Sequence, residues 1–232
     1  MNKFLPVVTI DGPSGVGKST VSDLLAKKLD IPHLDTGAMF RYSALVLEEN
    51  GPTMPDAEVQ TKLSKLDFDL VGNGAEAKLD CNGKAIGDEI RTEQVALLAS
   101  KIAQRPVVRQ FMLQSERKIG AKHAIIADGR DTGTVVFPDA AFKIFLTATP
   151  LTRAIRRKHD LAKMGIYADL ATLEKDMAER DKQDRDRKIA PLRPADDAKI
   201  IDNSNLTIEQ VLDEILAYIR QRGIATGTTL LP

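Results

Sequence analysis

The chain has 232 residues, of which 43% are hydrophobic and 28% charged, a composition typical of a globular protein rather than a disordered or fibrous one. Its 33 Lys and Arg residues balance its 33 Asp and Glu residues, which disfavours a partner as anionic as nucleic acid. The single cysteine, Cys81, allows no internal disulfide, and the N-terminal apolar run is too short for a signal peptide or a membrane span. We therefore expect a cytoplasmic protein with no nucleic-acid or membrane partner.

A strand, a glycine-rich turn and a helix are predicted in succession at the start of the chain. The β-branched run at residues 7–10 indicates a buried strand that ends at Asp11. Beyond Lys18 the apolar residues recur at helical spacing as far as Leu29, and Pro32 follows. The turn between them matches the pattern G-x-x-x-x-G-K-[ST], which binds nucleoside triphosphates when it lies between a strand and a helix.

Each residue type in this motif has a physical role. Gly15 and Gly17 let the backbone curl so that its N–H groups point at the β-phosphate, and the helix N-terminus adds partial positive charge. Lys18 would contact the β- and γ-phosphates, and the Ser19 hydroxyl would ligate Mg²⁺. A turn that only connects a strand to a helix is the alternative, which the flanking pattern disfavours. We predict an ATP and Mg²⁺ site formed by Gly12, Pro13, Ser14, Gly15, Val16, Gly17, Lys18, Ser19 and Thr20.

The elements predicted after this helix are a small antiparallel meander and two buried parallel strands. Between residues 60 and 90, short strand candidates separated by Gly72 to Gly74 and by Asn82 and Gly83 predict a small antiparallel meander. The apolar runs at 124–127 and 142–146 are typical of buried parallel strands. Strands that alternate with helices indicate the α/β fold of P-loop NTPases, with a central parallel sheet flanked by helices and a functional crevice at the carboxyl ends of the strands.

The last third of the chain is predicted to be mostly helical. A charged stretch from Leu151 to Arg187, interrupted near Gly165, has few large apolar residues, so it covers little core and can move. An apolar stripe at 208–219 indicates a final helix, and Thr207 with Gln210 has capping-box spacing at its start. We expect residues 223–232 to be a frayed tail.

Arginines at loop and strand ends favour a kinase over other users of the motif. They occur at positions 41, 109 and 130, and again at 180, 185 and 187. Phosphoryl transfer between two anionic substrates needs positive charge on the donor, the acceptor and the moving group, and guanidinium groups bind phosphate bidentately. For 180–187, where Asp181, Asp184 and Asp186 interleave, the alternative is a solvated, salt-bridged helix face. A nucleotide-dependent switch or binding module without turnover is the alternative function.

Five segments resemble bacterial cytidylate kinases, in order and over nearly the whole chain: residues 11–20, 34–41, 89–92, 128–138 and 179–192. The run D-G-R-D-T-G-T-V-V-F-P at 128–138 is more specific to that family than the glycine-rich motif. The resemblance implies transfer of the γ-phosphoryl group of MgATP to CMP and dCMP, in pyrimidine nucleotide metabolism. A kinase for another monophosphate, such as UMP or AMP, is the alternative. We expect a monomer.

The resemblance also implies a regional organisation and residue roles. It implies one kinase unit with its core at about 1–35, 105–150 and 195–222, a monophosphate-binding region with the insertion at about 36–104, and the lid at about 150–190. It implies that the cytosine is surrounded by Thr36, Ser100, Arg109 and Asp131. It implies that the ribose is contacted by Arg180 and Asp184, and that the acceptor phosphate is held by Arg41, Arg130 and Arg187. Lys18, Arg130, Arg180 and Arg187 would be the catalytic residues. A carboxylate can accept a hydrogen bond from the exocyclic amine of cytosine, whereas UMP offers a carbonyl there.

Some assignments stay open. Asp35 and Asp128 both follow apolar strand residues, so either could orient Mg²⁺-bound water, and Asp128 could also bind substrate or anchor Arg130. Phe40 and Gln183 lack groups that the family often has at those positions, and neither is given a role. The three histidines are isolated in the sequence, and we expect them at the surface or in packing.

Overall fold

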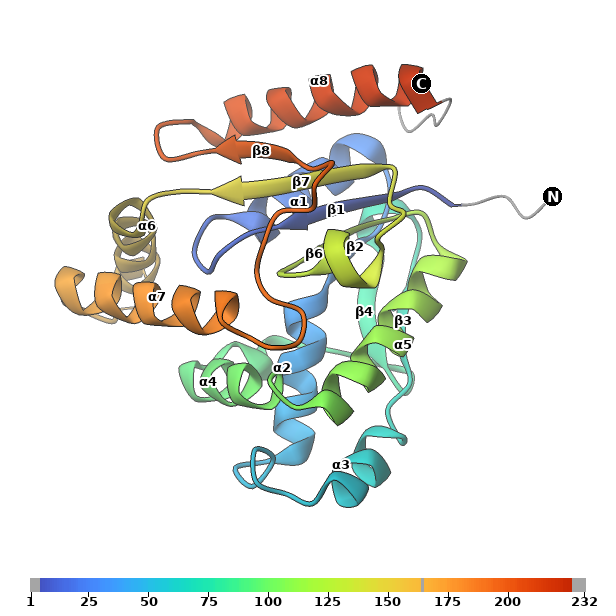
Figure 1. Cartoon of the computed structure of the whole chain (residues 1–232), viewed down its shortest axis with the longest axis vertical. Helices are drawn as coiled ribbons and strands as arrows, with labels where there is room; N and C mark the ends of the chain where they lie inside the picture. The colour runs from blue at the N-terminus through green and yellow to red at the C-terminus, as the bar shows by residue number, and fades with distance from the viewer. Residues whose placement is uncertain (1–4, 164, 227–232) are drawn as a thin grey trace. The chain divides into compact units, whose positions relative to one another are not determined.

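The computed structural model describes residues 5–163 and 165–226. Its strands form a five-stranded sheet in the order β2-β6-β1-β7-β8 and a three-stranded sheet in the order β3-β4-β5 (Figure 1). The predicted α/β fold, with a central parallel sheet and a small antiparallel insertion, is therefore confirmed. The chain divides into two compact units. The first combines the residues up to Val7 with Ala26–Asp128, and the second combines Val8–Leu25 with the chain from Gly129 onward.

In the first unit, two short parallel strands supply the site residues. They are β2 (His33–Asp35) and β6 (Ile125–Gly129), and their register sets Asp35 beside Asp128. Parallel strands bring their carboxyl ends to one edge of a sheet, so the side chains that follow them gather there. The helices of this unit are α2 (Thr36–Leu47), α3 (Asp56–Leu63), α4 (Glu93–Ile102) and α5 (Pro106–Lys122).

The insertion of the first unit is the predicted meander of β3 (Phe68–Val71), β4 (Lys78–Cys81) and β5 (Lys84–Ala85), with single 3₁₀ turns at Gly74–Glu76 and Asp88–Arg91. The turn between β4 and β5 has positive φ at both central residues, 56° at Asn82 and 78° at Gly83, as a two-residue hairpin requires. Phe68 is buried and holds the meander to the helices, with its ring centroid 5.9 Å from that of Tyr42 and 6.2 Å from that of Phe111. The insertion thus has its own apolar contacts with the helices of the first unit.

The second unit contains the predicted strand, turn and helix at its start. Strand β1 (Val7–Asp11) pairs in parallel with β7 (Phe142–Thr147), which pairs in parallel with β8 (Lys199–Asp202). The carboxyl end of β1 leads to helix α1 (Lys18–Leu29), and that of β7 leads to α6 (Pro150–Lys163). A π-helical turn at Thr132–Val136 precedes β7.

Helix α8 (Ile208–Thr226) begins with the predicted capping box. The Thr207 N–H donates to Gln210 Oε1 at 2.9 Å, and the Gln210 N–H donates to Thr207 Oγ1 at 3.3 Å. The helix continues through Thr226, so residues 223–226, which we expected in the tail, are helical because they extend a helix already packed through its apolar stripe. The rest of that tail, 227–232, lies outside the described residues.

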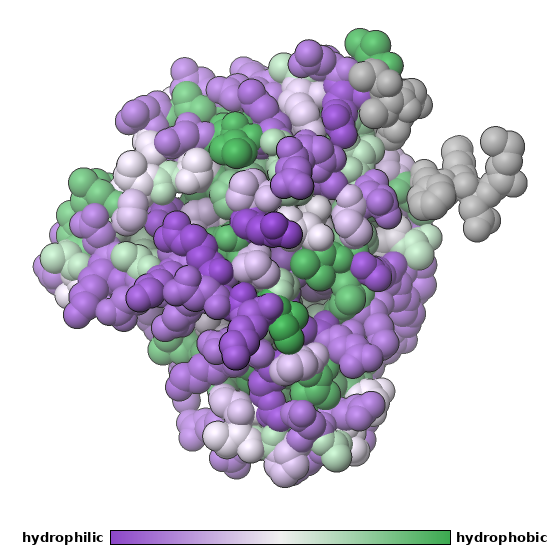
Figure 2. Space-filling view, in the orientation of Figure 1, coloured by the Kyte–Doolittle hydropathy of each residue, from purple (hydrophilic) through white to green (hydrophobic). Residues whose placement is uncertain are grey.

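Helices α6 and α7 (Leu170–Arg185) pack against each other, and the chain turns between them at Gly165, where φ is +76°. Hydrophilic side chains predominate along the visible face of α7 (Figure 2). The buried residues of α7 are Met177, Asp181 and Asp184, so two carboxylates stand where a helix usually buries apolar groups. Within the part of the chain that is described, no helix is long and apolar enough to cross a membrane.

Candidate functional site

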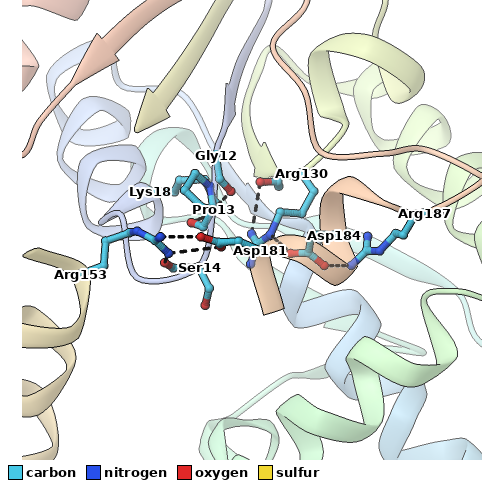
Figure 3. Close-up of polar contacts among 10 residues, drawn as sticks. Gly12, Pro13, Ser14, Lys18, Arg130, Arg153, Asp181, Asp184 and Arg187 are labelled. Atoms are coloured by element: carbon cyan, nitrogen blue, oxygen red, sulfur yellow. Dashed lines mark hydrogen bonds and ion pairs between the residues drawn. The ribbon is translucent and has the colours of Figure 1, made fainter. Parts of the chain in front are cut away.

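The glycine-rich turn follows β1, and its first residue, Gly12, has a backbone conformation that only glycine can adopt there. Gly12 has φ of +155°, and a Cβ atom there would lie 2.2 Å from the carbonyl oxygen of Leu146. Lys18 opens α1, and its buried Nζ donates to the carbonyl oxygens of Gly12 and Pro13, each at 2.9 Å (Figure 3). The structure therefore holds the ammonium group against the turn itself, while Ser19 and Thr20 in the same first helical turn are exposed.

Asp11, at the end of β1, anchors the segment that follows Arg130 and Asp131. Its Oδ1 accepts from the N–H of Thr132 at 2.9 Å and from the Thr132 hydroxyl at 2.8 Å, and its Oδ2 accepts from the N–H of Gly133 at 2.7 Å. Burial raises the pKa of Asp11 to about 6, although these three donors oppose the increase. No sequence motif indicates this contact, which joins residues 121 positions apart.

The pKa of Asp11 predicts a pH-dependent stability. Because the folded-state pKa is raised, Asp11 contributes stability that is present at low pH and is lost as the pH rises through about 6. The Asp11→Asn variant cannot ionise and lacks this dependence. The difference in unfolding free energy, wild type minus variant, should decrease by about 1 kcal/mol between pH 5 and pH 7.5 in urea unfolding experiments. A difference that stays constant or increases would contradict the assignment.

Three of the predicted residues meet in one cluster of the second unit, around a buried carboxylate. Asp184 has a side chain only 1% exposed, and its Oδ2 accepts from Arg130 Nε at 2.8 Å while its Oδ1 pairs with Arg187 (Figure 3). Burial raises the pKa of Asp184, but the positive charges of Arg130 and Arg187 outweigh it, and the pKa lies below its ordinary value. Arg180 also lowers the pKa. One carboxylate thus holds two guanidinium groups together, and the three side chains keep a net positive charge.

A second buried ion pair on α7 was not predicted. Arg153 on α6 is 2% exposed and pairs with Asp181, which is 3% exposed. The alternative of a solvated, salt-bridged helix face is therefore wrong about solvation for Asp181 and Asp184, which are buried, although both form ion pairs. Asp186 is exposed, as that alternative expects. The only signal in the sequence was the three-residue spacing of Asp181 and Asp184, which places them on one helix face.

In the first unit, the carboxyl ends of β2 and β6 bring four predicted residues together. Asp35 caps α2, because its Oδ1 accepts from the N–H of Ala38 at 2.8 Å, and its Oδ2 accepts from Arg41 at 2.9 Å. The Thr36 hydroxyl donates to the carbonyl oxygen of Asp128 at 2.8 Å. Among the described residues, the buried Nε of Arg41 has no hydrogen-bond partner. This guanidinium group therefore keeps a donor for an anionic ligand.

The two carboxylates at this edge influence each other. Burial raises the pKa of Asp35, and the neighbouring Asp128 carboxylate raises it further. His33 has no partner beside it in the sequence, but in the fold its Nε2 lies 3.4 Å from Asp128 Oδ1. An imidazole at this position can balance part of the negative charge of the pair.

Arg109 on α5 lies over the ring of Phe40 on α2, with its guanidinium carbon 5.6 Å from the ring centroid. A cation over an aromatic face is attracted by the ring quadrupole, so Phe40 helps to orient Arg109. Ser100 is half-buried on α4 of the same unit. Asp131, in the second unit, is buried, and the N–H groups of Thr134, Val135 and Val136 approach its carbonyl oxygen at 3.3, 2.9 and 3.2 Å.

The described residues contain no group of three or more His, Cys, Asp and Glu side chains arranged to hold a metal ion. Mg²⁺ does not require such a cage, because it commonly binds through water, substrate phosphates and one or two protein oxygens. Ser19, an exposed residue at the start of α1 with a hydroxyl group, fits that kind of site.

Comparisons of the chain with a family model and with individual proteins point to the same family. The sequence model of the family described as cytidylate kinase matches residues 8–221. The cytidylate kinase of Nitratidesulfovibrio vulgaris is 48% identical over 94% of this chain and 94% of its own length. That of Oleidesulfovibrio alaskensis is 47% identical over 92% and 98%, and that of Vibrio parahaemolyticus is 41% identical over 96% and 99%, respectively. The glycine-rich turn, the arginine cluster and this full-length similarity together show that the chain belongs to the cytidylate kinase family.

Proposed function

We propose that the chain is a phosphotransferase that moves the γ-phosphoryl group of ATP to CMP, and also to dCMP, giving ADP and CDP or dCDP. Beside the family membership, the observation that carries this proposal is the Asp184 cluster, in which Arg130 and Arg187 share one buried carboxylate. Transfer between two anions requires a cationic centre in addition to the one that binds the donor. The Lys18 turn provides the first centre and the arginine cluster the second.

On the donor side, residues 12–20 would bind the triphosphate. Lys18 would exchange the carbonyl oxygens of Gly12 and Pro13 for phosphate oxygens, which are stronger acceptors because they are charged. We propose Ser19 as the protein ligand of Mg²⁺, which would neutralise charge on the phosphates when it is bound. Asp35 and Asp128 stay the two candidates to orient its water ligands.

On the acceptor side, we propose the roles that the family resemblance implies. Arg41, Arg130 and Arg187 would hold the CMP phosphate, and the Nε of Arg41, which has no hydrogen-bond partner in the described part of the chain, supports this. Asp184 and Arg180 would contact the ribose. Thr36, Ser100, Arg109 and Asp131 would surround the cytosine, and the contact with Phe40 supports a fixed orientation of Arg109.

The proposed reaction is a direct in-line transfer. An oxygen of the CMP phosphate attacks the γ-phosphorus, a new P–O bond forms, and the bond from the γ-phosphorus to the bridging oxygen of ADP breaks. The acceptor oxygen is already anionic, so no protein nucleophile or general base is needed. The residues of the chain act by positioning the two anions and by compensating their charge. As the lid, residues 150–190 would exclude water, which otherwise competes as the acceptor.

An assay with a panel of acceptors tests this function. Purified protein with MgATP should form ADP much faster when CMP or dCMP is added. Acceleration by UMP or AMP but not by CMP would show that the acceptor assignment is wrong. Slow ADP formation that no monophosphate accelerates would favour the nucleotide-dependent switch. We further propose that the protein acts as a cytoplasmic monomer in pyrimidine nucleotide metabolism, and its mass in solution, measured by light scattering, tests the monomer.

Phe40 should affect CMP recognition through Arg109. The Phe40→Leu variant keeps an apolar side chain but loses the aromatic face, so kcat/KM for CMP should fall about fivefold, as expected for a contact of about 1 kcal/mol. Phe40→Tyr keeps that face and serves as the matched control, with kcat/KM near the wild-type value. Steady-state kinetics at saturating ATP measure both. If Phe40→Leu leaves kcat/KM for CMP unchanged, Phe40 does not orient Arg109.

A further inference from the structure

We propose that Arg153 and Asn203 are positioning residues that orient the phosphate-binding N–H groups of Gly15 and Gly17, and that Asp181 and Arg156 hold these two residues in place. The proposal rests on the proposed function, because it deepens the account of the ATP site. None of these four residues is in the predicted site. All of them, with the glycine-rich turn, lie in the second unit.

Arg153 contacts three segments at once. Its Nη1 donates to the carbonyl oxygen of Ser14 at 2.9 Å, and its Nη1 and Nη2 form a bidentate pair with Asp181 (Figure 3). Its Nε donates to the carbonyl oxygen of Ala148 at 3.1 Å. A buried guanidinium group is very costly without such partners. Among the side chains that are almost fully buried in the described part of the chain, that of Arg153 is the largest. The side chain therefore has essentially one position, which its three partners determine.

One helical turn later, α6 reaches the glycine-rich turn a second time. Arg156 donates from Nη1 to Asn203 Oδ1 at 3.0 Å and from Nη2 to the Asn203 carbonyl oxygen at 2.7 Å. Asn203 is 4% exposed, and its Nδ2 donates to the carbonyl oxygen of Val16 at 2.8 Å. Helix α6 thus holds two alternate carbonyl groups of the turn, that of Ser14 directly and that of Val16 through Asn203.

Holding these carbonyl groups has a geometric consequence for the ligand site. In a trans peptide the C=O bond and the following N–H bond point to opposite sides, and the described residues contain no cis peptide. A donor on the Ser14 carbonyl therefore fixes the direction of the Gly15 N–H, and a donor on the Val16 carbonyl fixes that of Gly17. Both N–H groups point away from the donors on their carbonyls. Successive N–H groups of such a turn form an anion-binding concavity, and those of Gly15 and Gly17 are the two that these contacts orient.

The same contacts also determine the position of α7. Asp181 and Asp184 lie three residues apart on one face of the helix, so a rotation that released Asp181 from Arg153 would also move Asp184. Asp184 holds Arg130 and Arg187. The methyl group of Met177 would lie 3.0 Å from a Cβ atom at Gly15, which adds a packing contact between α7 and the turn. The cationic cluster and the phosphate-binding turn are therefore coupled through Arg153.

The decisive experiment removes the donor to Ser14 without leaving a buried charge. In the double variant Arg153→Met/Asp181→Leu, apolar residues replace the ion pair, and such replacements are often neutral or stabilising. We expect this variant to remain folded, as measured by thermal unfolding, and its Kd for ATP without CMP to rise about 10- to 100-fold, as expected when a charged hydrogen bond is lost. Lys158→Ala, at an exposed position of the same helix, is the control and should bind ATP like the wild type.

Two further variants keep the test decisive if the double variant does not fold. Arg153→Lys retains a positive charge beside Asp181 but cannot reach Asp181 and Ser14 together, so its Kd for ATP should also rise. Asn203→Ala removes the donor to Val16 and should weaken ATP binding independently. Folded variants that bind ATP with the wild-type Kd would overturn the proposal. Because ATP binding is measured without an acceptor, failure of the kinase function would appear separately, as a wild type that binds ATP but does not phosphorylate CMP.

Discussion

The Lys18→Ala variant is expected to phosphorylate CMP with a kcat reduced about 10³-fold, at the upper end of the loss seen when one charge-stabilising donor is removed from an active site. Lys18 lies in the first turn of α1, and its ammonium group is held at the carbonyl oxygens of Gly12 and Pro13. There it can follow the charge that develops between the β- and γ-phosphates during transfer. The measurement is ADP formation at saturating ATP and CMP.

The matched control for this variant is Lys27→Ala, since Lys27 is exposed near the end of the same helix. It removes one positive charge from α1 without touching the turn, and its kcat should stay within about twofold of the wild type, because screened surface charges contribute little. A normal kcat for Lys18→Ala would remove Lys18 from the catalytic residues. An equal loss in Lys27→Ala would mean that net charge, and not the position of Lys18, determines the rate.

Local sequence signals predicted the parts of the fold whose partners are near in the chain. The glycine-rich turn, the hairpin at Asn82 and Gly83 and the capping box at Thr207 depend on contacts within a few residues. The glycine pattern could be interpreted from the sequence because the conformation of the turn depends on the glycine residues themselves. Gly12 must have positive φ where it passes the Leu146 carbonyl, and no other residue tolerates that combination.

The parts that could not be predicted depend on partners far away in the sequence. Arg153 has no distinctive neighbours in the sequence, and only the fold brings it to Ser14, 139 positions earlier. The same holds for Asp184, whose carboxylate meets Arg130 from 54 positions away. The three-residue strand β2 was likewise too short to show a clear period, although it positions Asp35. Whether the charged residues of α7 are buried depends on contacts with other parts of the fold. Their sequence pattern alone is therefore the same as that of a solvated helix face.

The Asp184→Ala variant should have the second large effect, on the acceptor rather than on the donor. Without its carboxylate, Arg130 and Arg187 repel each other and lose their shared partner, so they should no longer hold the CMP phosphate together. We expect kcat/KM for CMP to fall about 10²- to 10³-fold, while the Kd for ATP changes less than tenfold. The variant should also be less stable by about 3–5 kcal/mol, because one member of a buried ion pair is missing.

The pH dependence separates this electrostatic effect from simple loss of packing. Because the pKa of Asp184 is lowered in the folded protein, its contribution to stability is present at neutral pH and decreases as the pH falls below the ordinary pKa of an aspartate. The stability difference between wild type and Asp184→Ala should therefore shrink in acid, whereas a pure packing defect would not depend on pH. Asp176→Ala, at an exposed position of α7, is the matched control and should change neither stability nor kcat/KM. A CMP-specific loss in Asp184→Ala that is absent from this control would place the Asp184 cluster at the acceptor site, and an unchanged kcat/KM for CMP would remove the cluster from that site.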